Sequence, residues 1–181
     1  MLVTLIAHTN DPEKTIAAAA KLCYSDAHIE TLLDGLTPEK TAAFLQKLND
    51  FGHASPIEHA SFTFGIEGVS RTFLAQVTRH RIASFSVQSQ RYVRLDDFRY
   101  VVPPEIEAIP EAKEAFLASM EEDAKRYLDL AHKLEEGHTA RLMAEGMPEK
   151  QARAKASKQA NEDARFVLPN ACETKMVVTM N

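Results

Sequence analysis

Residues 79–92 carry most of the recognisable chemistry of this sequence, and they read Arg79-His80-Arg81-Ile82-Ala83-Ser84-Phe85-Ser86-Val87-Gln88-Ser89-Gln90-Arg91-Tyr92. The three arginines, the histidine and the serines supply many hydrogen-bond donors and little acceptor charge. A planar guanidinium group can hold a phosphate or a carboxylate with two parallel hydrogen bonds, and glutamine amides can read the edge of a planar ring. The stretch therefore predicts a site for an anionic ligand that carries a flat ring.

The charge around this stretch differs from that of the rest of the chain. Residues 71–99 contain six arginines and two aspartates, a local charge of +4 in a chain of net charge −5, which leaves −9 for the remainder. No lysine occurs between Lys47 and Lys113. A nucleic-acid groove usually mixes lysine with arginine, and the acidic remainder would repel a polyanion. The basic segment favours a small phosphorylated ligand over nucleic acid.

Two other interpretations of the basic segment stay open. The first is a solvated basic face without a ligand. The second is a non-catalytic nucleotide- or RNA-binding module that uses the arginines of Arg71–Arg99, with Phe85 and Tyr92 stacking on bases. The affinity of such a module would fall steeply with salt.

Length and composition predict a single globular domain over residues 1–181. The chain has 181 residues, of which 45% are hydrophobic and 26% charged, a composition typical of globular proteins. A chain of this length can bury one core without support from disulfides or metals. No window approaches the ~18 apolar residues that span a bilayer, and residues 1–8 show no export signal. We expect no membrane partner and a cytoplasmic protein. Cys23 and Cys172 form no CxxC pattern and are predicted to be reduced and buried.

The sequence before the stretch predicts two strands and three helices. Residues 1–7 and 62–66 have the apolar content or alternation of strands. Helices are predicted from Pro12 to about Cys23 and from Pro38 to Phe51, because each begins with a cap residue, a proline and an acid. Gly52 ends the second of these. A further helix over residues 69–80 leads into the basic stretch.

The sequence after the stretch predicts one strand and a helical insertion. Residues 98–102 have strand composition, and the long amphipathic pattern of residues 110–136 ends at Gly137. Shorter helices are predicted over residues 139–145 and 148–164. The predicted fold class is α+β, with a mainly antiparallel sheet packed with helices and an inserted helical subregion at about residues 108–164. Residues 175–181 read as an unfinished element, so we expect a chain truncated at its C-terminus.

The basic stretch also resembles a known family. Arg79-His80-Arg81, followed by seven residues and Ser89, matches the RHR-x7-S signature of the flavin-dependent thymidylate synthases, and Ser89-Gln90-Arg91-Tyr92 continues the match. The resemblance extends to the block His53-Ala54-Ser55-Pro56-Ile57-Glu58-His59, to Gln76 and to Ala164-Arg165-Phe166-Val167-Leu168-Pro169. Order and spacing agree over nearly the whole chain.

This resemblance implies the reductive methylation of dUMP to dTMP. Methylenetetrahydrofolate would give the carbon, NADPH the electrons, and FAD would carry the hydride, which no side chain can deliver. The implied FAD-binding residues are His53, Ser55, Arg79, His80, Arg81 and Asn181. The implied dUMP-binding residues are Gln76, Arg79, Ser89, Gln90, Arg91 and Arg165. The family assembles these sites from several subunits, so a homotetramer is expected.

The sequence departs from the family pattern at two places. Many relatives carry an acidic residue before the signature serine, where this chain has Ser86-Val87-Gln88. The arginine that polarises the uracil ring in the family is expected beyond Asn181, so no catalytic residue is named.

Two alternative chemistries have weaker support from the residues. His53, Glu58 and His59 lack the helical spacing and the third ligand of a metal site, so no metal is predicted. A nucleophilic Cys23 or Cys172 has no histidine or arginine close to it in sequence.

Overall fold

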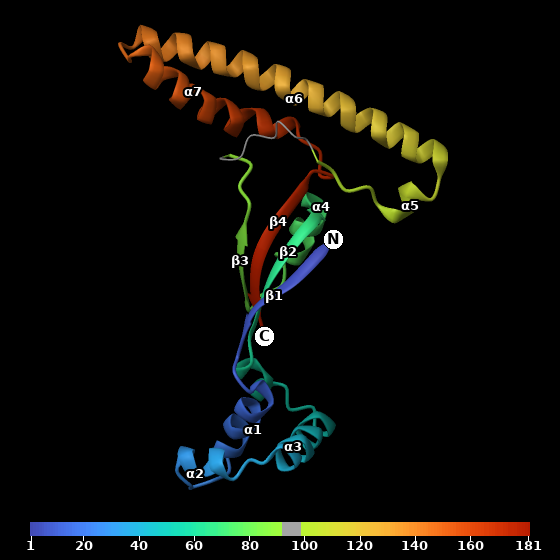
Figure 1. Ribbon diagram of the computed structural model, residues 1–181, viewed down its shortest axis with the longest axis vertical. Coiled ribbons are helices and arrows are strands. Elements are labelled where there is room, and N and C mark those ends of the chain that lie inside the picture. Colours follow the sequence, from blue (N-terminus) through green and yellow to red (C-terminus); the bar gives the residue numbers. More distant parts are fainter. Residues whose placement is uncertain (92–98) are drawn as a thin grey trace. The chain divides into compact units, whose positions relative to one another are not determined.

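The computed structural model describes residues 1–91 and 99–181 (Figure 1). Four strands form one antiparallel sheet in the order β1-β2-β4-β3. The strands are β1 (Leu2–His8), β2 (Phe62–Ser70), β3 (Ala83–Val87) and β4 (Glu173–Met180). The helices are α1 (Pro12–Leu22), α2 (Ile29–Asp34), α3 (Pro38–Asp50), α4 (Arg71–Val77), α5 (Pro104–Glu107), α6 (Pro110–Ala144) and α7 (Glu149–Ala164), with 3-10 turns η1 (Ser55–His59) and η2 (Arg165–Val167). The α+β prediction is confirmed.

The chain divides into two compact units. The first comprises Met1–Ile66, His80–Ser86 and Met176–Asn181, and the second comprises Glu67–Arg79 and Val87–Lys175. Strands β2 and β4 each contribute residues to both units. The single domain predicted for residues 1–181 stays a prediction.

The first unit has a small apolar core formed by α1, α3, Ala60 and β2. Ile16, Ala20, Leu48 and Ala60 are buried there, and three larger side chains pack against them, namely Phe44, Leu45 and Phe62. The predicted helix starts are confirmed, because α1 and α3 both begin at a proline. The Thr37 hydroxyl caps α3 by accepting a hydrogen bond from the Lys40 amide. The short helix α2 buries no residue, which explains why its sequence carries no periodic signal.

The second unit has its core between α6 and α7. Tyr127, Ala131 and Ala164 form one buried cluster, and Leu142, Ala152 and Ala156 form another. The buried face of α7 consists of alanines at every fourth position together with one asparagine, a pattern that allows two helices to approach closely. These alanines are Ala152, Ala156, Ala160 and Ala164.

Several predicted boundaries in the second unit are wrong. Helix α6 continues through Gly137 to Ala144, because the buried clusters on both sides of the glycine outweigh its helix-breaking cost of about 1 kcal/mol. The separate helix predicted over residues 139–145 is therefore the end of α6. Val69 and Ser70 belong to β2 rather than to the predicted helix. The helix α4 begins after Ser70, because the Ser70 hydroxyl caps it by accepting a hydrogen bond from the Phe73 amide at 3.1 Å.

The strand predicted over residues 98–102 also does not form in the described part of that range. Phe98 lies outside the described residues. Tyr100 forms an isolated antiparallel bridge with Cys172, and the Val101 amide donates to the Ala171 carbonyl at 2.9 Å. The segment that we expected to be an unfinished element is the strand β4, in which alternate residues are buried. Within the described ranges, no helix is long and apolar enough to cross a membrane.

Gly137 offers a simple test of the continuous α6 helix. Gly137→Ala is expected to stabilise the protein by about 0.5–1 kcal/mol, because nothing lies within 4 Å of the added methyl group and alanine favours a helix. Gly146→Ala is the matched control, since Gly146 has φ +91° and alanine is strained there. Urea unfolding of the two variants should therefore shift in opposite directions, and a loss of stability in Gly137→Ala would contradict a continuous helix.

Candidate functional site

The basic stretch passes through both units. Gln76 lies in the last turn of α4, and the Arg79 amide donates to its carbonyl at 3.1 Å in the second unit. His80 and Arg81 belong to the first unit. After β3, a strand that we did not predict, Ser89 and Arg91 are again in the second unit. The RHR triplet is fully on the surface of the chain, with Arg79, His80 and Arg81 all exposed.

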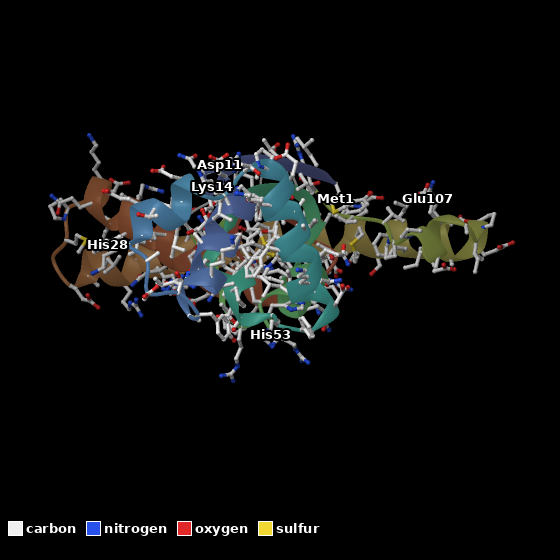
Figure 2. All side chains as sticks on the ribbon, turned by 90° about the horizontal axis from the view of Figure 1, so that it is seen from below. Met1, Asp11, Lys14, His28, His53 and Glu107 are labelled. Carbon is white, nitrogen blue, oxygen red and sulfur yellow. The ribbon has the colours of Figure 1, made fainter. Side chains whose placement is uncertain are left out.

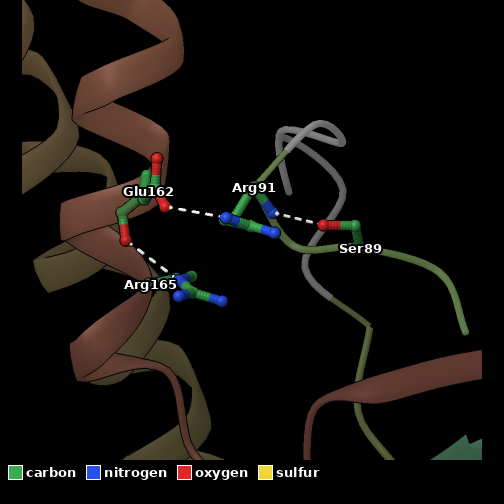
Figure 3. Close-up of polar contacts among 4 residues, drawn as sticks. All are labelled: Ser89, Arg91, Glu162 and Arg165. Carbon is green, nitrogen blue, oxygen red and sulfur yellow. Dashed lines mark hydrogen bonds and ion pairs between the residues drawn. The ribbon is translucent and has the colours of Figure 1, made fainter.

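In the second unit, two predicted dUMP-binding arginines meet at one residue of α7 (Figure 3). The Arg91 Nη1 lies 3.1 Å from Glu162 Oε1, and Arg165 Nε donates to the Glu162 carbonyl at 3.0 Å. The Arg91 amide donates to the Ser89 hydroxyl at 3.2 Å. Arg91, Arg165 and Ser89 are thus linked by contacts, although Arg165 is far from the others in sequence. This nucleotide cluster does not include Gln76, Arg79 or Gln90.

The ion pair in the nucleotide cluster is open to solvent. The Arg91 and Glu162 side chains are 47% and 42% exposed. An exposed pair of this kind contributes about 0–1 kcal/mol, because water screens the charges. The pair is therefore weak, and the Arg91 side chain stays in contact with solvent. A guanidinium has five N–H donors, so one group can hold Glu162 and a phosphate together.

Glu162, which contacts both arginines, is a residue that the sequence analysis did not identify. It lies three positions before Arg165 in the last turn of α7. That spacing brings its carbonyl to the Arg165 side chain, but the contact with Arg91 depends on tertiary structure. A carboxylate near an arginine on a helix is common, so the sequence alone held no distinctive signal for it.

The predicted FAD residues of the first unit lie on three separate segments. His53, labelled in Figure 2, and Ser55 are exposed around the start of η1. The His53 ring lies 6.2 Å from that of Phe51. His80 and Arg81 precede β3, and Asn181 follows β4. Asn181 lines a hollow of about 400 Å³ together with Glu58, Ser61, Ile82, Ala83, Ser84, Thr179 and Met180. Asn181 therefore lines the same hollow as Ile82, the residue that follows Arg81.

The described residues include only part of the basic segment. Tyr92, which continues the signature, lies outside the described residues, as do the remaining positions up to 98. Val87, which stands near the acidic position of many relatives, is half-buried at the end of β3. Among residues 1–91 and 99–181, no group of three histidines, cysteines or carboxylates is placed to hold a metal ion.

Comparison with known proteins agrees with the signature. The family described as thymidylate synthase complementing protein matches residues 4–181. A flavin-dependent thymidylate synthase from Clostridium tetani is 50% identical over 179 residues, covering 99% of this chain and 69% of the relative. One from Geobacter sulfurreducens is 44% identical over 183 residues, covering 100% and 68%. The chain belongs to the flavin-dependent thymidylate synthase family.

A solved structure from this family shares the fold. The flavin-dependent thymidylate synthase of Helicobacter pylori, crystallised with FAD and dUMP, matches with a TM-score of 0.58 and 24% identity. The match covers 100% of this chain and 79% of that chain. It supports the α+β assignment.

The two cysteines of this flavin-dependent thymidylate synthase family member differ in environment. Cys172 is buried as predicted, and burial raises the pKa of its thiol to about 11, against a smaller opposing effect of Arg71. Cys23 is exposed, so the prediction that both are buried is wrong. It is the C-cap of α1, and its Sγ lies 3.7 Å from the Ala19 carbonyl. A thiol pKa near 11 disfavours Cys172 as a nucleophile.

This difference predicts selective labelling. At pH 8 a thiol reagent should modify Cys23 of the native protein within minutes, whereas Cys172 should stay unmodified. With a pKa near 11, only about one Cys172 thiol in a thousand is ionised at this pH, and burial also blocks access of the reagent. Ellman's reagent should release one equivalent from native protein and two after unfolding. Rapid release of two equivalents from the native state would contradict the burial of Cys172.

Proposed function

We propose that this chain converts dUMP to dTMP, taking the carbon from methylenetetrahydrofolate and the electrons from NADPH. The observation that carries the proposal is the nucleotide cluster, in which Arg91, Ser89 and Arg165 are grouped at the end of α7 in a chain with the family signature. Arginine forks and a serine hydroxyl suit a nucleotide phosphate. The other residues proposed to contact dUMP are Gln76, Arg79 and Gln90.

The exposed donors of the RHR triplet and of the first unit suit an FAD molecule. Histidine and arginine side chains can hold a pyrophosphate, and amide and hydroxyl groups can hold the polar edge of a ring. The residues proposed to hold FAD are His53, Ser55, Arg79, His80, Arg81 and Asn181. When bound, FAD supplies the hydride that side chains cannot deliver. The protein contributes by binding and orienting the nucleotide and the cofactor.

The visible spectrum of the purified protein tests this function first. Oxidised flavin bands are expected, followed by dTMP formation when dUMP, methylenetetrahydrofolate and NADPH are added. A colourless protein whose binding to RNA falls steeply with salt would instead favour the non-catalytic module. Flavin bands without dTMP formation would support the cofactor assignment and leave the reaction unsupported.

We also propose a homotetramer in which subunits share the FAD site. Strand β1 lies at an edge of the sheet, and its large apolar side chains are half exposed, with Leu2 at 58%, Val3 at 51%, Leu5 at 50% and Ile6 at 56%. An exposed apolar edge strand favours association with another chain. The exposure of Arg79, His80 and Arg81 in one chain agrees with a site completed by a neighbour.

Substitution in β1 tests this assembly. Leu5→Lys is expected to convert the tetramer into smaller species and to lower the flavin content, because a buried lysine in an apolar interface is costly. Light scattering after size exclusion measures the mass, and absorbance measures the flavin. Leu128→Lys, on α6 and 39% exposed, is the control. A monomer that keeps its flavin at low concentration would contradict the shared site.

A cytoplasmic location is part of the same proposal. The two cysteines are free, as is usual in a reducing compartment, and the proposed reaction consumes NADPH.

A further inference from the structure

Helices α1 and α3 of the first unit differ at their N-termini. In α3 the Thr37 hydroxyl accepts a hydrogen bond from the Lys40 amide, as a capping residue does. In α1 the capping position is held by Asp11, a residue type that caps well, but its side chain makes no capping hydrogen bond. Asp11 has φ 43°, in the left-handed region, whereas a capping residue is normally extended. The start of α1 therefore lacks the side-chain cap that its sequence would allow.

Two backbone amides at the start of α1 have no acceptor as a consequence. The first backbone hydrogen bond of this helix runs from the Thr15 amide to the Asp11 carbonyl, at 2.9 Å. Pro12 has no amide hydrogen, so the unpaired amides are those of Glu13 and Lys14, which have no acceptor in the described part of the chain. Unpaired amides and the positive end of the helix dipole together attract an anionic group.

A buried hydroxyl of α3 lies beside these amides. A hollow of about 490 Å³, here called the α1 hollow, is lined by residues 11–14, Leu36, Pro38 and Thr41, all of the first unit. Thr41 is only 4% exposed. Its hydroxyl forms no hydrogen bond with another described residue, and its oxygen is not sealed from solvent. Because a buried polar group without a partner is costly, this hydroxyl indicates a ligand in the α1 hollow.

The charges around the α1 hollow favour a carboxylate over a phosphate. Asp11 and Glu13 are exposed and Lys14 is half-buried, and together they carry a charge of −1 (Figure 2). A phosphate group, with its larger negative charge, would be repelled more than a singly charged carboxylate. The two amides, the Thr41 hydroxyl and the Lys14 ammonium are four donor groups, and a carboxylate offers about four lone-pair sites. Leu36 supplies apolar surface for the rest of the ligand.

We propose that the α1 hollow binds a small monocarboxylic acid with an apolar body. Its carboxylate accepts hydrogen bonds from the Glu13 and Lys14 amides and from the Thr41 hydroxyl. The ligand thus supplies the cap that Asp11 withholds and the partner that Thr41 lacks. The proposal does not depend on the proposed function.

Titration with 4,4,4-trifluorobutyrate, followed by fluorine NMR, tests the proposal. FAD and dUMP are present in excess, so that the arginines proposed to hold them are not available to the probe; the titration is repeated without them. Thr41→Val replaces the hydroxyl with a methyl group and is expected to bind the probe roughly 10-fold more weakly. Thr41→Ser keeps the hydroxyl and should bind within about 3-fold of the unsubstituted protein. Without the probe, Thr41→Val should melt at least as high as the unsubstituted protein, because it removes a buried hydroxyl that has no partner.

The matched control is Thr31→Val. Thr31 is exposed on α2 in the same unit and does not line the α1 hollow, so probe affinity should not change. Butyrate should displace the probe at a much lower concentration than butylammonium or butyl phosphate. Equal probe affinity of Thr41→Val and the unsubstituted protein would overturn the proposal. Displacement by butylammonium or butyl phosphate as effective as that by butyrate would also overturn it, as would an absence of probe binding at millimolar concentrations.

Discussion

Arg91→Lys is expected to weaken dUMP binding by about 1–3 kcal/mol, or roughly 5- to 150-fold in Kd, with the flavin content largely unchanged. Lysine keeps the positive charge but loses the planar fork that can hold Glu162 and a phosphate together. The contact of Arg91 with Glu162, at 3.1 Å, would be replaced by a flexible ammonium group that cannot serve both partners in the same geometry. Calorimetric titration with dUMP measures the loss.

Arg153, on α7, provides the matched control for this prediction. Arg153 lies 2.9 Å from the Glu149 carboxylate on the helix surface and is not part of the nucleotide cluster. Arg153→Lys should bind dUMP like the unsubstituted protein. Equal affinity of Arg91→Lys and the unsubstituted protein would remove Arg91 from the proposed dUMP site.

Tyr127→Ala is expected to have the largest effect on stability, about 3–5 kcal/mol of the free energy of unfolding. Tyr127 is 1% exposed and packs with Ala131, Ala164 and Leu168 between α6 and the end of α7. Removal of its ring leaves a cavity that the small alanines around it cannot fill. Urea unfolding followed by circular dichroism measures the change.

The neighbouring residue distinguishes packing from a general effect on the helix. Leu128 is 39% exposed, so Leu128→Ala should cost about 1 kcal/mol or less. Ala164 directly precedes Arg165, and we therefore expect Tyr127→Ala also to weaken dUMP binding. Similar unfolding curves for the two variants would show that Tyr127 is not the centre of this core.

Local signals in the sequence predicted the elements whose formation depends on local interactions. The proline and the acid in the first turns of α1 and α3 act through backbone geometry and the helix dipole, which a short stretch of sequence records. The alternation in β4 was not recognised in detail, but its apolar content was sufficient to indicate an element. The end of α6 was misplaced at Gly137 because long-range packing, which the local pattern does not contain, decides whether a helix continues through a glycine.

The candidate site shows the same difference between features that local sequence predicts and features that depend on long-range contacts. The signature residues were found because their types and spacing are distinctive. Glu162 was missed because its contact with Arg91 joins segments that are distant in sequence, and the exposure of Cys23 depends on what packs around the end of α1. The left-handed backbone conformation of Ile82 was also not predicted, since isoleucine is not a residue from which such a conformation is expected.

The division of the chain into two units has a consequence for the order in which the protein folds during synthesis. The first unit needs Met176–Asn181, so its sheet cannot be completed until β4 has left the ribosome. Helices α6 and α7 are adjacent in sequence and pack on each other, so their hairpin can form from local contacts before β4 is made. The hairpin is then in place while β1 and β2, with their apolar side chains, still await the strand that joins the sheet. During this interval the nascent chain exposes the edge of an incomplete sheet, and it is then most exposed to aggregation and most dependent on chaperones.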